Sequence, residues 1–168
     1  MAFLTRKISR AKWQDDSGQG RIYADAVTSD LKTTQNTLSF WRFDEGTDEA
    51  KMYGETALAI VAGWQDIDKI DLVWLQESVL EDDNVCLKST AGQTPVLDLV
   101  QHHLDAVDID IEALGRVARR LASQIRNSGH VRRMSISEVK RLLQNAVDSG
   151  RVAIDSLSPK VREKLRPP

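Results

Sequence analysis

A histidine and a carboxylate are spaced for proton-transfer chemistry at one point in the sequence. His102 follows Asp98 by four residues, so on a helix the carboxylate could orient the imidazole as a general base or a metal ligand. His103 would point about 100° away from His102, so the two adjacent rings cannot chelate one ion. No His-Glu-x-x-His spacing is present. We interpret these residues as surface or boundary side chains, and the sequence leaves an enzymatic role of Asp98 and His102 undecided.

Acidic side chains form a second chemical candidate. Asp66, Asp68 and Asp71 surround the entrance of an expected strand, and metal-dependent nucleases carry acids at such strand ends. A metal-dependent hydrolase or nuclease is therefore the second alternative function. Glu81, Asp82, Asp83 and Asn84 offer further oxygen ligands but lack the spacing of a calcium-binding loop, so they are interpreted as a solvated turn. The prediction is that the chain carries no metal and no cofactor.

Nucleotide-binding and nucleophile motifs are absent. The sequence has no Walker A ending, no Gly-x-Gly-x-x-Gly after a strand and no Gly-x-Ser-x-Gly. The single cysteine, Cys86, lies in a short apolar run and is expected to be packed as a small hydrophobe. One cysteine cannot form an internal disulfide, and no stretch resembles a signal peptide or a membrane span. These features predict a cytoplasmic protein with no membrane partner and favour a non-catalytic role.

Charge is distributed unevenly along the chain. The net charge is only -2, but residues 109–168 hold 13 basic and 6 acidic side chains. Residues 44–108 hold 3 basic and 15 acidic side chains. Such asymmetry indicates either internal complementarity, a partner protein that recognises one or both regions, or nucleic acid on the basic region.

The basic region is densest between residues 114 and 134, which contain six arginines and no acid. On a helix over 111–127 the apolar residues fall on one side and the arginines on the other, where they could reach successive phosphates. The segment between the expected helices is too long for a helix-turn-helix turn. The predicted binding residues are Arg116, Arg119, Arg120, Arg126, Arg132 and Arg133, together with Trp13 as an exposed aromatic anchor. The alternative for Trp13 is that it folds back as a lid over the edge of the sheet.

Strands are predicted mainly in the first half. In the run from Thr37 to Asp44, Leu38 and Phe40 fall on one face and Trp41 and Phe43 on the other, which is typical of a strand covered on both sides. Further strands are expected at 3–9, 69–75 and 84–89.

Helices are predicted by apolar residues at helical spacing. Ser135 and Glu138 have the spacing of a capping box, and Val96, Val100 and Leu104 form a stripe after Pro95. Helices are expected at 48–64, 95–107, 111–127, 135–150 and, for a turn or two, from 158.

The predicted fold class is therefore α+β, with a small β-sheet and one packing helix in the N-terminal half, followed by a helical C-terminal half. Residues 1–94 are expected to form an α+β subdomain with an acidic surface, and residues 95–168 a helical subdomain with a basic surface, or both to form one continuous domain. The predicted function is a non-catalytic protein-protein interaction module, such as a toxin-neutralising, regulatory or accessory subunit. The first alternative is a nucleic-acid-binding module that uses the arginine face of helix 111–127.

Overall fold

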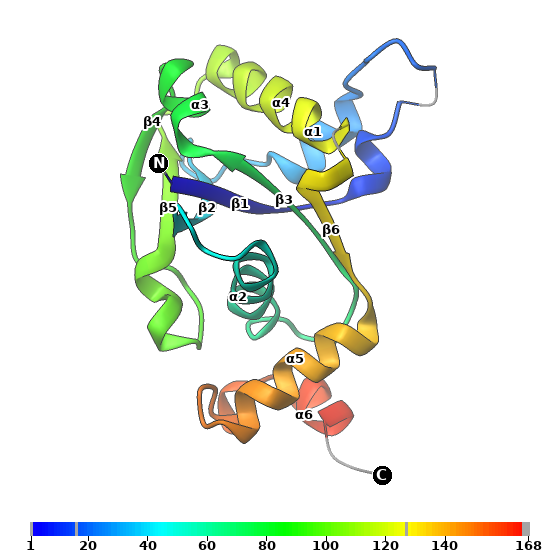
Figure 1. Ribbon diagram of the computed structural model, residues 1–168, viewed down its shortest axis with the longest axis vertical. Helices are drawn as coiled ribbons and strands as arrows, with labels where there is room; N and C mark the ends of the chain where they lie inside the picture. Colours follow the sequence, from blue (N-terminus) through cyan, green and yellow to red (C-terminus); the bar gives the residue numbers. More distant parts are fainter. Residues whose placement is uncertain (1, 16, 127, 166–168) are drawn as a thin grey trace.

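A six-stranded antiparallel sheet lies between two layers of helices in the computed structural model, which describes residues 2–15, 17–126 and 128–165 (Figure 1). This architecture confirms the predicted α+β class. The strands of the described residues are β1 Ala2–Ile8, β2 Leu38–Asp44, β3 Ile70–Gln76, β4 Cys86–Ser89, β5 His103–Val107 and β6 Val131–Met134.

The strand order is β4-β5-β2-β1-β3-β6, and each neighbouring pair is antiparallel. Thr5 of the central strand β1 lies opposite Trp41 of β2 and Trp74 of β3. Its buried hydroxyl donates to the carbonyl oxygen of Trp41 at 3.2 Å and shares a hydrogen bond with the hydroxyl of Thr56. A polar residue is tolerated in the centre of this core because its hydroxyl has partners.

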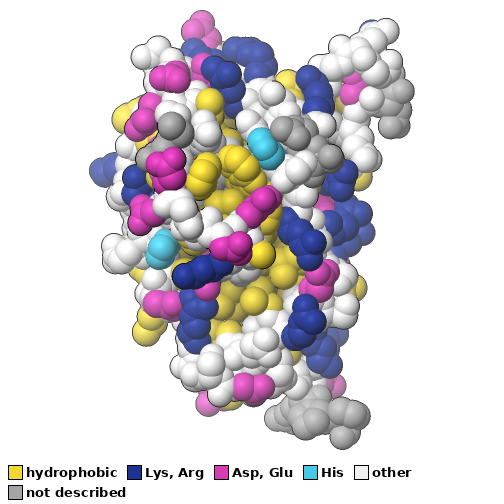
Figure 2. Space-filling view, in the orientation of Figure 1, with side chains coloured by type: hydrophobic (Ala, Val, Ile, Leu, Met, Phe, Trp, Pro, Cys, Tyr) yellow, Lys and Arg dark blue, Asp and Glu magenta, His cyan; other side chains and the backbone are white. Residues whose placement is uncertain are grey.

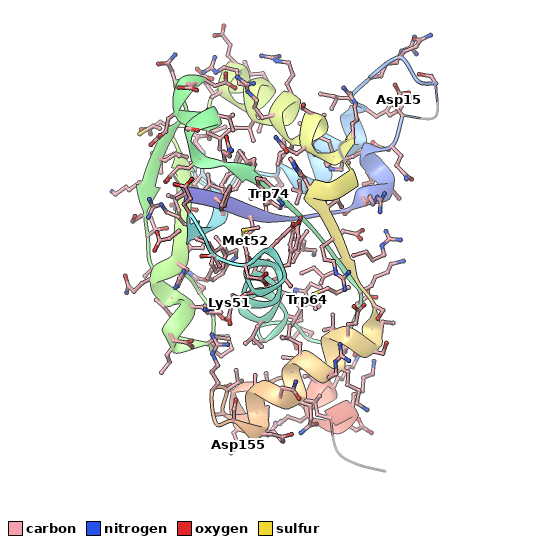
Figure 3. All side chains as sticks on the ribbon, in the orientation of Figure 1. Asp15, Lys51, Met52, Trp64, Trp74 and Asp155 are labelled. Carbon is pink, nitrogen blue, oxygen red and sulfur yellow. The ribbon has the colours of Figure 1, made fainter. Side chains whose placement is uncertain are left out.

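Helices cover both faces of the sheet (Figure 1). Side chains alternate along β2, so Trp41 packs against the layer that contains α2, α5 and α6, while Phe40 packs against the layer of α1, α3 and α4. Trp74 and Met52 belong to the first layer, between the sheet and α2 (Figure 3). The α-helices are α1 Ala24–Asp30, α2 Glu49–Val61, α3 Glu77–Asp82, α4 Ile111–Arg126, α5 Ile136–Asp148 and α6 Pro159–Leu165.

Local capping explains where two of the long helices begin. The side chain of Asp48 accepts from the backbone N–H of Lys51 at the start of α2. Ser135 and Glu138 form the predicted capping box at the start of α5, with both reciprocal bonds present. Among the described residues no helix combines the length and the apolar composition needed to cross a membrane.

Two strands lie in the region that was expected to be helical only. The predicted helix over 95–107 is instead a 3-10 helix, Leu97–His102, followed by β5. The reason is that Leu104 and Ala106 alternate inward and β5 pairs on both sides, with β2 and β4, which outweighs the helical spacing. Strand β6 pairs with β3, so strands from residues 1–94 and from residues 95–168 share one sheet.

Candidate functional site

The arginines of α4 differ in how far the protein itself neutralises them. Arg120 donates two hydrogen bonds of 2.7 Å to Asp83, and Arg116 lies 4.0 Å from Glu112. Arg119 is exposed and forms no ion pair with a described residue. Arg126 donates to the backbone carbonyl oxygen of Gly20, which carries no charge.

The two arginines of β6 are both paired. Arg132 donates to Glu138 at 2.7 Å. Arg133 donates Nε and Nη2 to the carboxylate of Asp71 at 2.6 and 2.9 Å. These two side chains keep 54% and 46% exposure, so they form ion pairs and still face solvent.

Ion pairs also connect the basic and acidic regions of the sequence elsewhere. Arg151 donates to Glu55 and to Asp98, and Lys164 donates to Asp66 at 2.5 Å. With Arg120–Asp83 and Arg133–Asp71, these pairs neutralise much of the charge asymmetry inside the protein. The available cations are therefore fewer than the sequence count suggests.

Trp13 is not an exposed anchor. It is 5% exposed and packs in the layer with α1 and α4, and its indole N–H donates to Asp30 at 2.7 Å. Of the two alternatives for Trp13, the exposed anchor is wrong and the residue is buried, because its ring packs against α1 and α4 and Asp30 of α1 accepts from its indole N–H.

The Asp98 and His102 pair does not form. Asp98 accepts from Arg151 at 2.9 Å, while Nδ1 of His102 lies 2.9 Å from the carbonyl oxygen of Arg42. Asp66 and Asp71 are likewise each engaged by a basic side chain. Among the described residues no group of three or more His, Cys, Asp or Glu side chains is placed to hold a metal ion.

An apolar hollow with a basic rim lies at the start of α5. Ile136, the first residue of this helix, is 53% exposed although the rest of the helix buries its apolar face. The side chains of Lys69 and Lys140 stand beside it and form no ion pair with a described residue. We call this site the Ile136 surface, and it consists of Lys69, Arg133, Ser135, Ile136, Ser137 and Lys140. Lys and Arg side chains gather along the side of the molecule where β6 and the start of α5 lie (Figure 2).

A second hollow of about 490 Å³ continues from the Ile136 surface, because Lys69 and Arg133 line both. It is lined on the far side by Trp64, and the ammonium of Lys7 lies 5.0 Å from the centre of that ring. Trp64 lies just beyond the end of α2 (Figure 3). An aromatic ring thus extends the basic, partly apolar surface, which provides the mixture of contacts typical of binding interfaces.

The sequence interpretation did not single out Ile136 or Lys69 as binding residues. A signal for Ile136 was present, since it follows the N-cap Ser135 and lies outside the inward apolar set of α5. Lys69 lies at the start of β3, and only the pairing of β3 with β6 brings it to Arg133 and α5. That proximity depends on a strand that the sequence did not predict.

Surface chemistry is the evidence for function in this protein, since comparison of the chain with protein-family models, curated proteins and solved structures finds no match. Two surfaces remain as candidates for a macromolecular ligand. The first is the Ile136 surface. The second is the outer face of α4, where Arg119 and Arg126 have no carboxylate partner among the described residues.

Proposed function

We propose that this chain is a non-catalytic cytosolic interaction module that binds an acidic segment of a partner protein at the Ile136 surface. Such a module could serve as a regulatory, accessory or toxin-neutralising subunit. The position of Ile136 carries the proposal, because this half-exposed side chain lies in an apolar hollow beside Lys69 and Lys140. The exposed part of this large aliphatic side chain gains no burial energy in the isolated chain, but it supplies an apolar anchor within a polar rim.

Charge favours an acidic occupant. Lys69 and Lys140 have no carboxylate partner within the described residues, and Arg133 is half exposed beside them. Opposite charge on a partner would accelerate encounter and set its orientation, while desolvation of Ile136 would supply most of the affinity. The occupant that fits is therefore a protein segment with an aliphatic or aromatic side chain flanked by Asp or Glu.

Selection from a display library of random 12-residue peptides tests this proposal. We expect the recovered peptides to carry Asp or Glu on both sides of one apolar residue. Ile136→Ser should weaken binding of a selected peptide at least about 10-fold, as for an interface hot spot. Replacing Lys69 and Lys140 by Glu should lower the association rate and its dependence on salt.

Ile111→Ser is the matched control, since Ile111 is also the first residue of a long helix and is 80% exposed. Its replacement should leave the affinity unchanged. The proposal fails if selection shows no enrichment of acidic residues, or if the Ile111 and Ile136 variants bind the peptides equally well.

A nucleic-acid-binding module is the second candidate function. It is supported by Arg119 and Arg126, which form no ion pair with a described carboxylate. Phosphate contacts would make binding of labelled single- and double-stranded DNA fall steeply between about 50 and 200 mM salt. Replacing both residues by Glu should remove this binding, whereas Arg162→Glu on α6 should not; retention by the double variant would exclude this face.

A further inference from the structure

A cleft of about 540 Å³ lies beside β2 and β5 on the α2 side of the sheet. It differs from the Ile136 surface in that no Lys or Arg is among the described residues that line it. Among the described residues that line it, Asp105 is the only Asp, Glu, Lys or Arg. The polar side chains around it are Thr34, Thr37, Ser39, Gln93, His103 and Asp105.

The imidazole of His103 is held rigidly at the wall of this cleft. Its ring meets the ring of Trp41 edge-on, with centroids 5.2 Å apart. Gly92 packs so closely on both residues that an added Cβ would lie 2.9 Å from Cβ of His103 and from Cη2 of Trp41. The backbone N–H of Thr90 donates to the carbonyl oxygen of His103, which fixes the loop over the ring.

Thr90 determines which nitrogen of His103 carries the proton. Its hydroxyl lies 2.8 Å from Nδ1 of His103 and donates to Oδ2 of Asp105, also at 2.8 Å. A hydroxyl has one proton, so the oxygen that donates to Asp105 accepts from Nδ1–H. In the neutral ring Nε2 is then left with its lone pair.

Nε2 of His103 has no hydrogen-bond donor among the described residues. Oδ1 of Asp105, which is itself an acceptor, lies 4.0 Å from Nε2. Burial lowers the pKa of His103 below its usual value, although the charge of Asp105 opposes that shift, so the ring is neutral at neutral pH. Two acceptors therefore face one another across a gap that a hydrogen-bond donor can fill.

The carboxylate of Asp105 lines the cleft and forms no ion pair with a described Lys or Arg side chain, although Arg6 interacts with it electrostatically. Its oxygens accept from the hydroxyls of Ser39 and Thr90, which are neutral donors. A carboxylate oxygen can accept more than one hydrogen bond, so Oδ1 retains capacity for a ligand. A cation beside Oδ1 and Nε2 would gain both charge attraction and two acceptors.

We propose that this cleft binds a small organic ammonium ion, with one N–H directed to Nε2 of His103 and a second to Oδ1 of Asp105. A nitrogen about 2.8 Å from each atom spans their 4.0 Å separation. The remaining part of the ligand lies against Trp41 and the hydroxyls of Thr34 and Thr37. The site is separate from the proposed partner surface, because the two share no residue.

Nuclear magnetic resonance of the ¹⁵N-labelled protein at pH 7.5 tests the proposal with three probes of similar size. Ethylammonium has charge and N–H donors, tetramethylammonium has charge without N–H, and ethanol has a donor without charge. We expect ethylammonium to shift the Nε2 resonance of His103 with saturation. The other two probes should produce no saturable shift.

His102 provides the internal control, because it neighbours His103 in sequence and does not line the cleft. Its resonances should be unaffected by all three probes, and His102→Gln should leave binding intact. Asp105→Asn should reduce the affinity for ethylammonium at least 10-fold while the amide spectrum stays dispersed. Absence of a saturable shift in the wild-type protein, or equal saturation by tetramethylammonium or ethanol, overturns the proposal whatever the variants do.

Discussion

Arg133 donates two hydrogen bonds to Asp71, from Nε to Oδ1 at 2.6 Å and from Nη2 to Oδ2 at 2.9 Å. The carboxylate also accepts from the backbone N–H of Arg10 at 3.2 Å. This arrangement joins β6 to β3 and brings a basic side chain to the rim of the Ile136 surface. One pair thus links the acidic and basic regions of the chain and helps to shape the proposed binding surface.

Asp71→Asn should lower the free energy of unfolding by about 1–2 kcal/mol at neutral pH, because charge-assisted hydrogen bonds to a buried carboxylate are lost. Urea denaturation measures the change. Asp68→Asn is the control, since Asp68 is exposed and its carboxylate accepts from the N–H of Lys69 next to it. Equal destabilisation by both variants would contradict a special role for the pair.

The carboxylate of Asp71 should also make the free energy of unfolding fall at acidic pH. Burial opposes ionisation of Asp71, but hydrogen bonds from Arg133 and Arg10 outweigh it and hold the pKa of Asp71 below its usual range. The unfolded chain then takes up the proton first, so this stabilisation is present above about pH 4 and is lost as pH falls through the folded pKa. Unfolding measured from pH 7 to pH 3 should show a shallower decline in Asp71→Asn than in the wild type.

His103 should titrate below its ordinary pKa, because burial disfavours the imidazolium. Since the unfolded chain binds the proton more readily, the free energy of unfolding should fall as pH drops from about 6.5 toward the folded pKa. Imidazole ¹⁵N shifts followed against pH measure this midpoint and identify the protonated nitrogen. A midpoint at or above 6.5, or a proton on Nε2 in the neutral form, would refute the arrangement around Thr90.

Two glycine substitutions should act in opposite directions. Gly92→Ala places a Cβ against His103 and Trp41 and should destabilise the fold by about 1–3 kcal/mol. Gly54→Ala, within α2, meets nothing within 4 Å and should stabilise it by about 0.5–1 kcal/mol. Thermal unfolding of both variants provides the measurement. If Gly92→Ala leaves the stability unchanged, the loop over the cleft is not tightly packed.

Cys86 should react with a thiol reagent in the folded protein. The sequence predicted a packed thiol, but Cys86 is exposed because β4 is an edge strand of the sheet. Native protein should therefore be labelled on one thiol without denaturant by 5,5′-dithiobis(2-nitrobenzoic acid). Labelling only after addition of urea would mean that the edge is covered in solution.

The parts of the fold that were predictable have a strong local signal. Alternating apolar residues marked β2, and a helical stripe with a capping box marked α5. Strand β5 was missed because Val96, Val100 and Leu104 recur at helical spacing by coincidence, while pairing with β2 and β4 determines the strand. Such pairing involves residues distant in sequence, which periodicity within one window cannot report.

The two proposed sites were hidden for a related reason. His103 and Asp105 are two residues apart on β5 and therefore share one face of the sheet. Thr90 contacts them only because β4 pairs with β5 and the chain after β4 lies beside His103. The sequence shows the arginines, but it does not show which of them lack a carboxylate partner within the protein and could bind a ligand. Whether Arg120 or Arg119 finds a carboxylate depends on where α3 and its acids lie in three dimensions.

The position of β1 at the centre of the sheet has a consequence for synthesis on the ribosome. Phe3 pairs with Phe43 of β2 on one side and with Gln76 of β3 on the other. Strand β1 therefore cannot pair on both sides until both of these later strands have been synthesised. Closing such long loops costs chain entropy and slows folding. Until residue 76 has left the exit tunnel β1 cannot complete its pairing with β3, so we expect the native sheet to form only after that point.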